Sequence, residues 1–183
     1  MNTGMNETSM IIGIINVSDR ASAGVYEDIP GKEAKAWLED MVATPWQLEY
    51  AVVPDEQDRI AATLIDMADR RGCRLIITTG GTGPAPRDVT PEATMQVCER
   101  LLPGFGEAMR ADSRRNVPTA ILSRQIAGSR GACLIVNLPG KPAAIRECLN
   151  SIATALPYAI FLISGSTVEY RPGKTEAFRP RET

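Results

Sequence analysis

Short apolar runs alternate with amphipathic helical patterns in the first half of the chain. The runs are rich in β-branched residues, which is typical of strands buried on both faces. They lie at residues 10–17, 48–53 and 75–77. Apolar residues at three- and four-residue spacing predict helices over about residues 31–43 and from Asp55, a good cap, to Gly72. Strands alternating with helices predict a parallel α/β sheet.

The second half is less regular. Helical patterns cover residues 91–102, 105–115 and 142–164, the last with a bend expected at Pro157. Residues 132–138 form another buried strand pattern, preceded by a glycine-containing loop at residues 128–131. We therefore expect a three-layer α/β/α fold with a mostly parallel central sheet.

No internal repeat or linker divides the chain. We expect one catalytic domain over residues 10–165, a short N-terminal segment at residues 1–9 and an extended C-terminal tail at residues 166–183. The tail is polar and lacks any periodicity.

Composition limits the groups that could take part in catalysis. The chain has 183 residues, a net charge of −2 and no histidine. The charge argues against a nucleic-acid binder, and the missing histidine removes the commonest general base and any Ser-His-Asp arrangement. Catalysis would have to use carboxylates, Lys or Arg, hydroxyls, backbone dipoles or a bound metal.

The four cysteines form no C-x-x-C pair, and each lies in or beside an apolar segment. This is typical of small buried residues in a reducing compartment. No signal peptide opens the sequence and no apolar run is long enough to span a membrane. We therefore expect a cytoplasmic protein.

One stretch, residues 75–94, combines a strand, a glycine loop and a helix start. The loop 78–83 reads TTGGTG, and Arg87-Asp88 precede the helix start at Thr90-Pro91, where the hydroxyl of Thr90 would cap the helix. Free N–H groups in such a loop can bind an anion. The loop matches neither the P-loop nor the dinucleotide-binding fingerprint, and it could equally be an ordinary turn.

The carboxyl ends of parallel strands share one edge of a sheet, where ligands bind. By that rule we expect four polar segments to lie close together: Asn16–Arg20, Asp55, residues 78–88 and residues 137–141. Asp55 and Asp88, with Asp19 as a third candidate, would suit Mg²⁺ bridging to phosphate. Against this, Asp55 could only cap a helix, and Asp88 could pair with Arg87 or serve a turn.

A second strand-to-helix turn, residues 138–142, contains Lys141 and could bind an anion or a ring edge at the helix start. An ordinary turn is the simpler interpretation. Ser113, Ser123 and Arg124 are, taken alone, surface residues.

Several motifs together go beyond these general patterns. The segment 78–94, TTGGTGPAPRDVTPEAT, resembles the signature of the molybdenum-cofactor biosynthesis fold shared by molybdopterin adenylyltransferases and related domains of gephyrin and plant cofactor-synthesis proteins. Residues 18–28, SDRASAGVYED, resemble the first loop of the bacterial branch. Further matching segments follow in family order at residues 54–56, 103–107, 119–124 and 137–140.

The resemblance implies that the terminal phosphate of molybdopterin attacks the α-phosphate of Mg-ATP, giving adenylyl-molybdopterin and pyrophosphate. Asp55 and Asp88 match the functional aspartates and would hold Mg²⁺ or orient the phosphates. The resemblance also implies a homotrimer and a downstream molybdate-insertion enzyme, with no nucleic-acid or membrane partner. The substrate-binding residues it implies are Thr79, Gly80, Gly81, Thr82, Gly83, Ser113 and Ser123. The nucleotide-binding residues it implies are Ser18, Asn137, Pro139 and Gly140.

One feature departs from the bacterial pattern: Cys148-Leu149 runs almost directly into the apolar segment 153–163, where bacterial members carry an extra segment. The alternative function within this fold is a non-catalytic molybdopterin-binding or molybdate-insertion accessory protein. Two further classes compete with these, a non-catalytic scaffold and an unrelated nucleotide-binding enzyme.

Overall fold

The structure, a computed structural model, describes residues 9–25 and 27–180. Most of the expected N-terminal segment, Tyr26 of the first loop motif and the last three tail residues lie outside the described residues.

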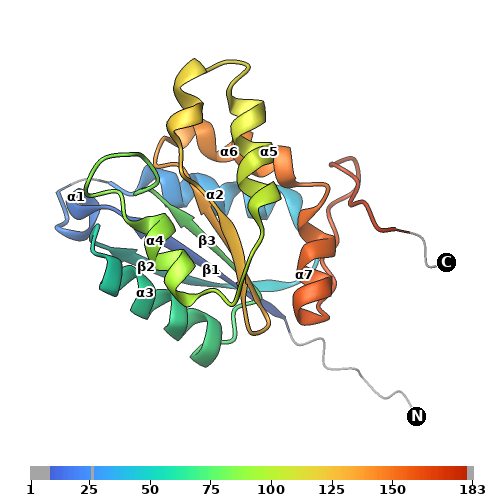
Figure 1. Ribbon diagram of the computed structural model, residues 1–183. Coiled ribbons are helices and arrows are strands. Elements are labelled where there is room, and N and C mark those ends of the chain that lie inside the picture. Colours follow the sequence, from blue (N-terminus) through green and yellow to red (C-terminus); the bar gives the residue numbers. More distant parts are fainter. Residues whose placement is uncertain (1–8, 26, 181–183) are drawn as a thin grey trace, which may run out of the picture.

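A six-stranded sheet in the order β2-β1-β3-β6-β5-β4 forms the centre (Figure 1). The first four strands of this order are parallel, and β5 and β4 pair antiparallel at one side. The strands are β1 Met10–Val17, β2 Trp46–Val53, β3 Leu75–Thr79, β4 Arg100–Leu101, β5 Ala127–Arg130 and β6 Cys133–Leu138.

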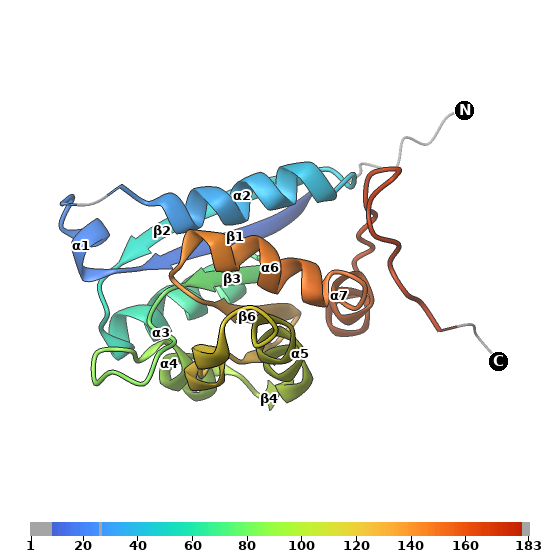
Figure 2. The same cartoon turned by 90° about the horizontal axis from the view of Figure 1, so that it is seen from above.

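Helices cover both faces of the sheet, as Figure 2 shows from above. One core packs α2, α5, α6 and α7 against the sheet, and the other packs α3 and α4 against its opposite face. The expected three-layer α/β/α fold with a mostly parallel sheet is confirmed. The helices are α1 Asp19–Ser22, α2 Ile29–Met41, α3 Gln57–Ile65, α4 Thr90–Val97, α5 Pro103–Ser113, α6 Pro142–Ile152 and α7 Leu156–Ser164. A π-helical turn, Asp66–Arg70, extends α3, and a 3₁₀ turn covers Pro118–Leu122.

The strand register places four strand ends together. Val17 is opposite Val53, Asn16 is opposite Thr79, and Thr79 is opposite Leu138. Because these four strands are parallel, the loops that follow them leave from one edge of the sheet. We call it the carboxyl edge.

Two predicted elements differ in the structure. The expected loop at residues 128–131 is mostly strand β5, which forms a hairpin with β6 through Gly131 at φ +50°. A Cβ on Gly128 would lie 2.7 Å from the Cys98 sulfur, so small residues are required where β5 packs. The predicted helix 91–102 ends at Val97, and the chain continues into β4.

The single long helix predicted over residues 142–164 is two helices, α6 and α7, which meet at 70°. Pro157 lies in the first turn of α7, where its missing N–H costs no helical bond. The chain therefore breaks before the proline instead of bending around it. Among the described residues no single helix is long and apolar enough to cross a membrane; the bent α6–α7 pair meets that test by length and composition alone.

The segment after α7 packs back onto the domain. Val168 is buried in the core, and Tyr170 pairs with Val42 in an isolated bridge. The Tyr170 ring meets Trp37 edge-on at 6.3 Å, and its hydroxyl donates to the Ala153 carbonyl at 2.9 Å. Tyr170 therefore ties this segment to α2 and to the end of α6.

This packing predicts that Tyr170→Ala lowers the free energy of unfolding by about 2–4 kcal/mol, because an aromatic contact and a hydrogen bond are lost together. Phe178→Ala, in the same segment but 68% exposed, should change it by less than about 0.5 kcal/mol. Urea unfolding curves of both variants measure the difference. A change of less than about 0.5 kcal/mol in Tyr170→Ala as well would contradict the contribution of Tyr170 to the core.

Candidate active site

The glycine loop after β3 is held by its neighbours on three sides. Gly80 and Gly81 have φ of +94° and +61°, and a Cβ on Gly80 would lie 2.3 Å from the Val17 carbonyl oxygen. The Gly80 N–H donates to the Leu138 carbonyl at 3.1 Å, and the Thr90 hydroxyl donates to the Gly80 carbonyl at 2.9 Å. The loop therefore approaches β1 more closely than any side chain would allow, and it is hydrogen-bonded to the end of β6.

Thr90 does not cap α4 as the sequence predicts. It is the first residue of the helix, and the N-cap is Val89. Its hydroxyl is a donor to Gly80 and does not accept a bond from a helical N–H. Thr90 therefore anchors the glycine loop to α4.

Asp19 and Asp55 bind each other's backbone. The Asp19 N–H donates to Asp55 Oδ2 at 2.9 Å, and the Asp55 N–H donates to Asp19 Oδ1 at 3.0 Å. This reciprocal pair joins the loop after β1 to the loop after β2. The prediction that Asp55 caps the next helix is wrong: the N-cap is Glu56, without a side-chain bond, because the Asp55 carboxylate accepts from Asp19 instead.

Arg87 connects the third loop to this pair. Its guanidinium reaches both carboxylate oxygens of Asp19, with Nη2 at 2.6 Å from Oδ2 and 2.7 Å from Oδ1. Asp88, the partner that the sequence suggests for Arg87, instead accepts the Ala85 N–H at 3.0 Å and closes its own turn. A Cβ on Gly83 would lie 2.7 Å from this carboxylate, so the turn requires glycine there.

The surroundings move the pKa values of Asp19 and Asp55 in opposite directions. The hydrogen bond from Arg87 holds the pKa of Asp19 below its ordinary value. Burial raises the pKa of Asp55, and the charges of Asp19 and Asp88 raise it further, opposed by the Asp19 N–H and by Arg87. Asp55 is thus a carboxylate whose ionised form is disfavoured mainly by burial and, to a lesser degree, by the nearby charges of Asp19 and Asp88.

A polar cavity of about 260 Å³ lies at the carboxyl edge beside Asp55. It brings together five residues that the sequence predicts for the site: Ser18, Asp55, Gly80, Gly81 and Gly140. Asn16 and Pro30 also line it. The sequence places Asn16 among the polar strand ends at this edge but assigns it no ligand, whereas Pro30, at the start of α2, carries no signal that would have marked it.

A larger cavity of about 590 Å³ is lined by the other predicted group, Ser113, Ser123 and Pro139, together with Lys141. Gly140 lines the smaller cavity and its two neighbours line the larger one, so the turn 139–141 lies between the two. Arg110 and Gln125 also line the larger cavity and are not among the predicted site residues. Arg110 donates to the Gln125 carbonyl at 2.7 Å and so holds this wall in place.

Three predicted residues have buried side chains. The Thr79 hydroxyl donates to Asn16 at 3.2 Å, and Thr82 is only 5% exposed. Asn137 donates to the hydroxyls of Thr78 and Thr94 at 3.0 and 2.9 Å, and its Oδ1 has no hydrogen-bond partner among the described residues. These side chains hold β3, β6 and α4 together beneath the loops.

The donor set at this edge fits one kind of metal site. Among the described residues, no cluster of three or more His, Cys, Asp or Glu side chains is arranged to hold a metal ion. Mg²⁺ differs from zinc in needing only one or two carboxylates when substrate phosphates complete its shell. Asp55 lines the polar cavity and Asp88 is near enough for its charge to act on Asp55, so two carboxylates of the kind that Mg²⁺ prefers lie at this edge.

The cysteines offer no reactive thiol at the site. All four are free, and burial raises the pKa of Cys73 and of Cys98 to about 11. A buried, protonated thiol is a poor nucleophile.

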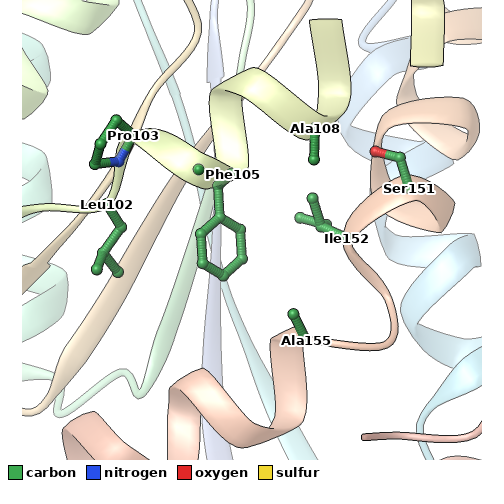
Figure 3. A pocket seen from close by; sticks show the side chains of 8 residues that line it. Leu102, Pro103, Phe105, Ala108, Ser151, Ile152 and Ala155 are labelled. Atoms are coloured by element: carbon green, nitrogen blue, oxygen red, sulfur yellow. The ribbon is translucent and has the colours of Figure 1, made fainter. Parts of the chain in front are cut away.

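An apolar cavity of about 330 Å³ lies between the start of α5 and the end of α6. In Figure 3, Phe105 of α5, Ile152 at the end of α6 and Ala155 just before α7 point into it. It contains none of the predicted site residues.

The raised pKa of Asp55 predicts how Asp55→Asn changes stability with pH. Ionised Asp55 opposes folding, so the variant should have a higher Tm than wild type at neutral pH. As the pH falls through the raised pKa, the wild-type carboxyl takes up a proton in the folded state and the difference should shrink. Thermal unfolding from pH 4 to 8 tests this, with Glu107→Gln, at an exposed position of α5, as control. A less stable Asp55→Asn at neutral pH would contradict it.

Comparisons with known proteins find close relatives of this chain. A Helicobacter pylori protein named "Molybdopterin adenylyltransferase" is 52% identical over 171 residues, 93% of this chain and 97% of that protein. The Escherichia coli K12 protein of the same name is 47% identical over 182 residues, covering 93% of each. Both likenesses extend over nearly the whole chain.

Solved structures of molybdopterin biosynthesis proteins superpose on this fold. The molybdopterin biosynthesis enzyme MoaB from Thermus thermophilus superposes with a TM-score of 0.79 at 42% identity, over 86% of this chain and 98% of that one. The molybdopterin biosynthesis Mog protein from Mycobacterium ulcerans has a TM-score of 0.79 at 38% identity, over 85% and 100%. The family described as "Probable molybdopterin binding domain" matches residues 13–158. The chain belongs to this molybdopterin-binding family.

Proposed function

We propose that the protein is a molybdopterin adenylyltransferase of molybdenum cofactor biosynthesis, which transfers the adenylyl group of ATP to molybdopterin. The observation that carries this proposal is the 47–52% identity to proteins of that name over nearly their whole length. The carboxyl edge supports it, because the glycine loop and Asp55 line a polar cavity there, and Asp19 and Asp88 lie close to Asp55. The reaction needs two phosphate-bearing ligands side by side, and the turn 139–141 lies between those two cavities.

The proposed reaction needs no general base. The terminal phosphate oxygen of molybdopterin is already an anion and attacks the α-phosphorus of ATP. A new phosphorus–oxygen bond forms, the bond from the α-phosphorus to the bridging oxygen breaks, and pyrophosphate leaves with that electron pair. Catalysis is then positioning and charge neutralisation, which is consistent with a chain without histidine.

Within this proposal each cavity receives one ligand. ATP lies in the cavity beside Asp55, bordered by Ser18, Gly140 and the neighbouring backbone of Asn137 and Pro139. Molybdopterin lies in the larger cavity against Ser113 and Ser123. The phosphates meet at the glycine loop, 79–83. Backbone N–H groups of this loop other than that of Gly80, which donates to Leu138, are the donors, because the side chains of Thr79 and Thr82 are buried.

We also propose that Asp55 and Asp88 hold Mg²⁺. When bound, Mg²⁺ would neutralise the charge that develops on the phosphates during transfer. Asp19 and Arg87 then contribute indirectly: their hydrogen bonds keep Asp55 oriented toward the cavity.

The alternative, a non-catalytic molybdopterin-binding or molybdate-insertion accessory protein, is not favoured. Relatives at 47–52% identity carry the name of the enzyme. An enzyme that accepts adenylyl-molybdopterin and inserts molybdate is the partner that this reaction would serve.

Pyrophosphate release from ATP by the purified protein tests the function. We expect release only when molybdopterin and Mg²⁺ are both present. Asp88→Asn should lower the rate at least about 100-fold, because an amide keeps the turn with Ala85 but removes the charge. Asp112→Asn, a carboxylate on α5, is the matched control and should keep the wild-type rate. Tight molybdopterin binding without pyrophosphate release would favour the accessory role instead.

We further propose a cytoplasmic homotrimer. The free cysteines are consistent with a reducing compartment. Apolar side chains exposed on α7, Phe161 at 43% and Leu162 at 64%, are consistent with assembly.

Light scattering after size-exclusion chromatography should give a mass three times the 19.8 kDa of the chain. A mass of 19.8 kDa at micromolar concentration would contradict the trimer and leave the proposed reaction untouched.

A further inference from the structure

Arg124 contacts both ends of the loop that carries Arg87 and Asp88. Its backbone N–H donates to the Thr82 carbonyl at 2.8 Å, and its Nε donates to the Gly83 carbonyl at 2.8 Å. Its Nη2 donates to the carbonyl of Asp88. One guanidinium therefore fixes two carbonyls that lie five positions apart in the same loop.

Glu92 in turn fixes the guanidinium. Its Oε1 accepts from Nη1 of Arg124, and its Oε2 lies 3.3 Å from Nη2. Glu92 lies in the first turn of α4, the helix that also anchors the glycine loop through Thr90. The side chains of Arg124 and Glu92 are 38% and 35% exposed, so the pair is partly shielded from solvent.

These bonds leave the Arg124 guanidinium little capacity for a ligand. A guanidinium has about five N–H donors, and here all three of its nitrogens already bind protein atoms. Arg124 also does not line either cavity at the carboxyl edge. Its contacts indicate that Arg124 supports the loop and does not bind a substrate.

The loop has few other restraints. Pro84, Ala85, Pro86 and Arg87 are exposed, and the remaining contacts are the turn of Asp88 with Ala85 and the pairing of Arg87 with Asp19. Without Arg124 the carbonyls of Gly83 and Asp88 would lose their shared donor.

We propose that Arg124, held by Glu92, is a positioning residue that fixes the loop 83–88 so that Asp88 and Arg87 face Asp55. The planar fork of arginine can serve two carbonyls and a carboxylate at once, which a lysine ammonium on a flexible stem cannot do with the same geometry. The proposal rests on the proposed function for its catalytic consequence, but the effect on the loop is independent of it.

Arg124→Lys is the first test, with Glu92→Gln as a milder variant that is isosteric. Arg130→Lys is the matched control. Arg130 forms an equivalent pair with Asp69, Nη2 to Oδ2 at 2.6 Å, and donates to the Val97 carbonyl at 3.0 Å, away from the loop.

Hydrogen exchange of the protein without ligands measures the loop directly. We expect amide exchange over residues 82–88 to be about 10-fold faster or more in Arg124→Lys, intermediate in Glu92→Gln and unchanged in Arg130→Lys. Unchanged exchange in Arg124→Lys would overturn the proposal whatever the activity. This result also stands if wild type fails to release pyrophosphate, so failure of the proposed function and failure of the positioning role are distinguishable.

Kinetics supply the second readout. We expect kcat to fall about 30–100-fold in Arg124→Lys and about 3–10-fold in Glu92→Gln, because small displacements of a reacting group cost about this much. The KM for molybdopterin should stay within about 3-fold, and Arg130→Lys should retain wild-type values. A rise in KM with kcat unchanged would overturn the proposal, since it would place Arg124 in binding. Equal losses in the Arg130→Lys control would also overturn it.

Discussion

The parallel pairing of β2, β1, β3 and β6 is the constraint on which the site depends. It makes four strands end at one edge, so that loops far apart in the sequence become neighbours. The loops are then joined by their own hydrogen bonds: Asp19 to Asp55, Gly80 to Leu138, and Arg87 to Asp19. A glycine loop that approaches β1 too closely for any Cβ completes the edge. The result is a polar cavity whose lining includes Asp55 and the glycine loop.

Three aspartates in one small area would repel one another in water, and more strongly where water is partly excluded. The structure divides that charge unequally. Arg87 neutralises Asp19, whose pKa falls, whereas burial raises the pKa of Asp55. Under the proposed reaction, a cation held beside Asp55 would neutralise charge where the phosphates meet. Adenylyl transfer between two anions needs such neutralisation more than it needs a proton acceptor, which is consistent with a chain that lacks histidine.

The strands and the glycine loop could be predicted because their signals are local: continuous β-branched runs, three close glycines and a proline at a helix start. Strand β5 could not, since its small residues Ala127, Gly128 and Ser129 suit close packing and have low strand propensity. The partner of Arg87 was also beyond local reasoning, because Asp19 lies 68 positions away. Arg124 looks like a surface residue in the sequence, and only the fold shows that it binds the loop. Asn137 and Thr79 could be assigned to the site region, but their burial depends on packing between β3, β6 and α4.

The most direct test of the central claim is to follow the label from ATP. The purified protein would be incubated with molybdopterin, Mg²⁺ and ATP labelled with ³²P at either the α- or the γ-phosphate, and the pterin product would be isolated by chromatography. The proposed function predicts label in the product from α-labelled ATP and none from γ-labelled ATP, which should release its label as pyrophosphate. Label from the γ position, or no labelled pterin from either substrate, would contradict adenylyl transfer.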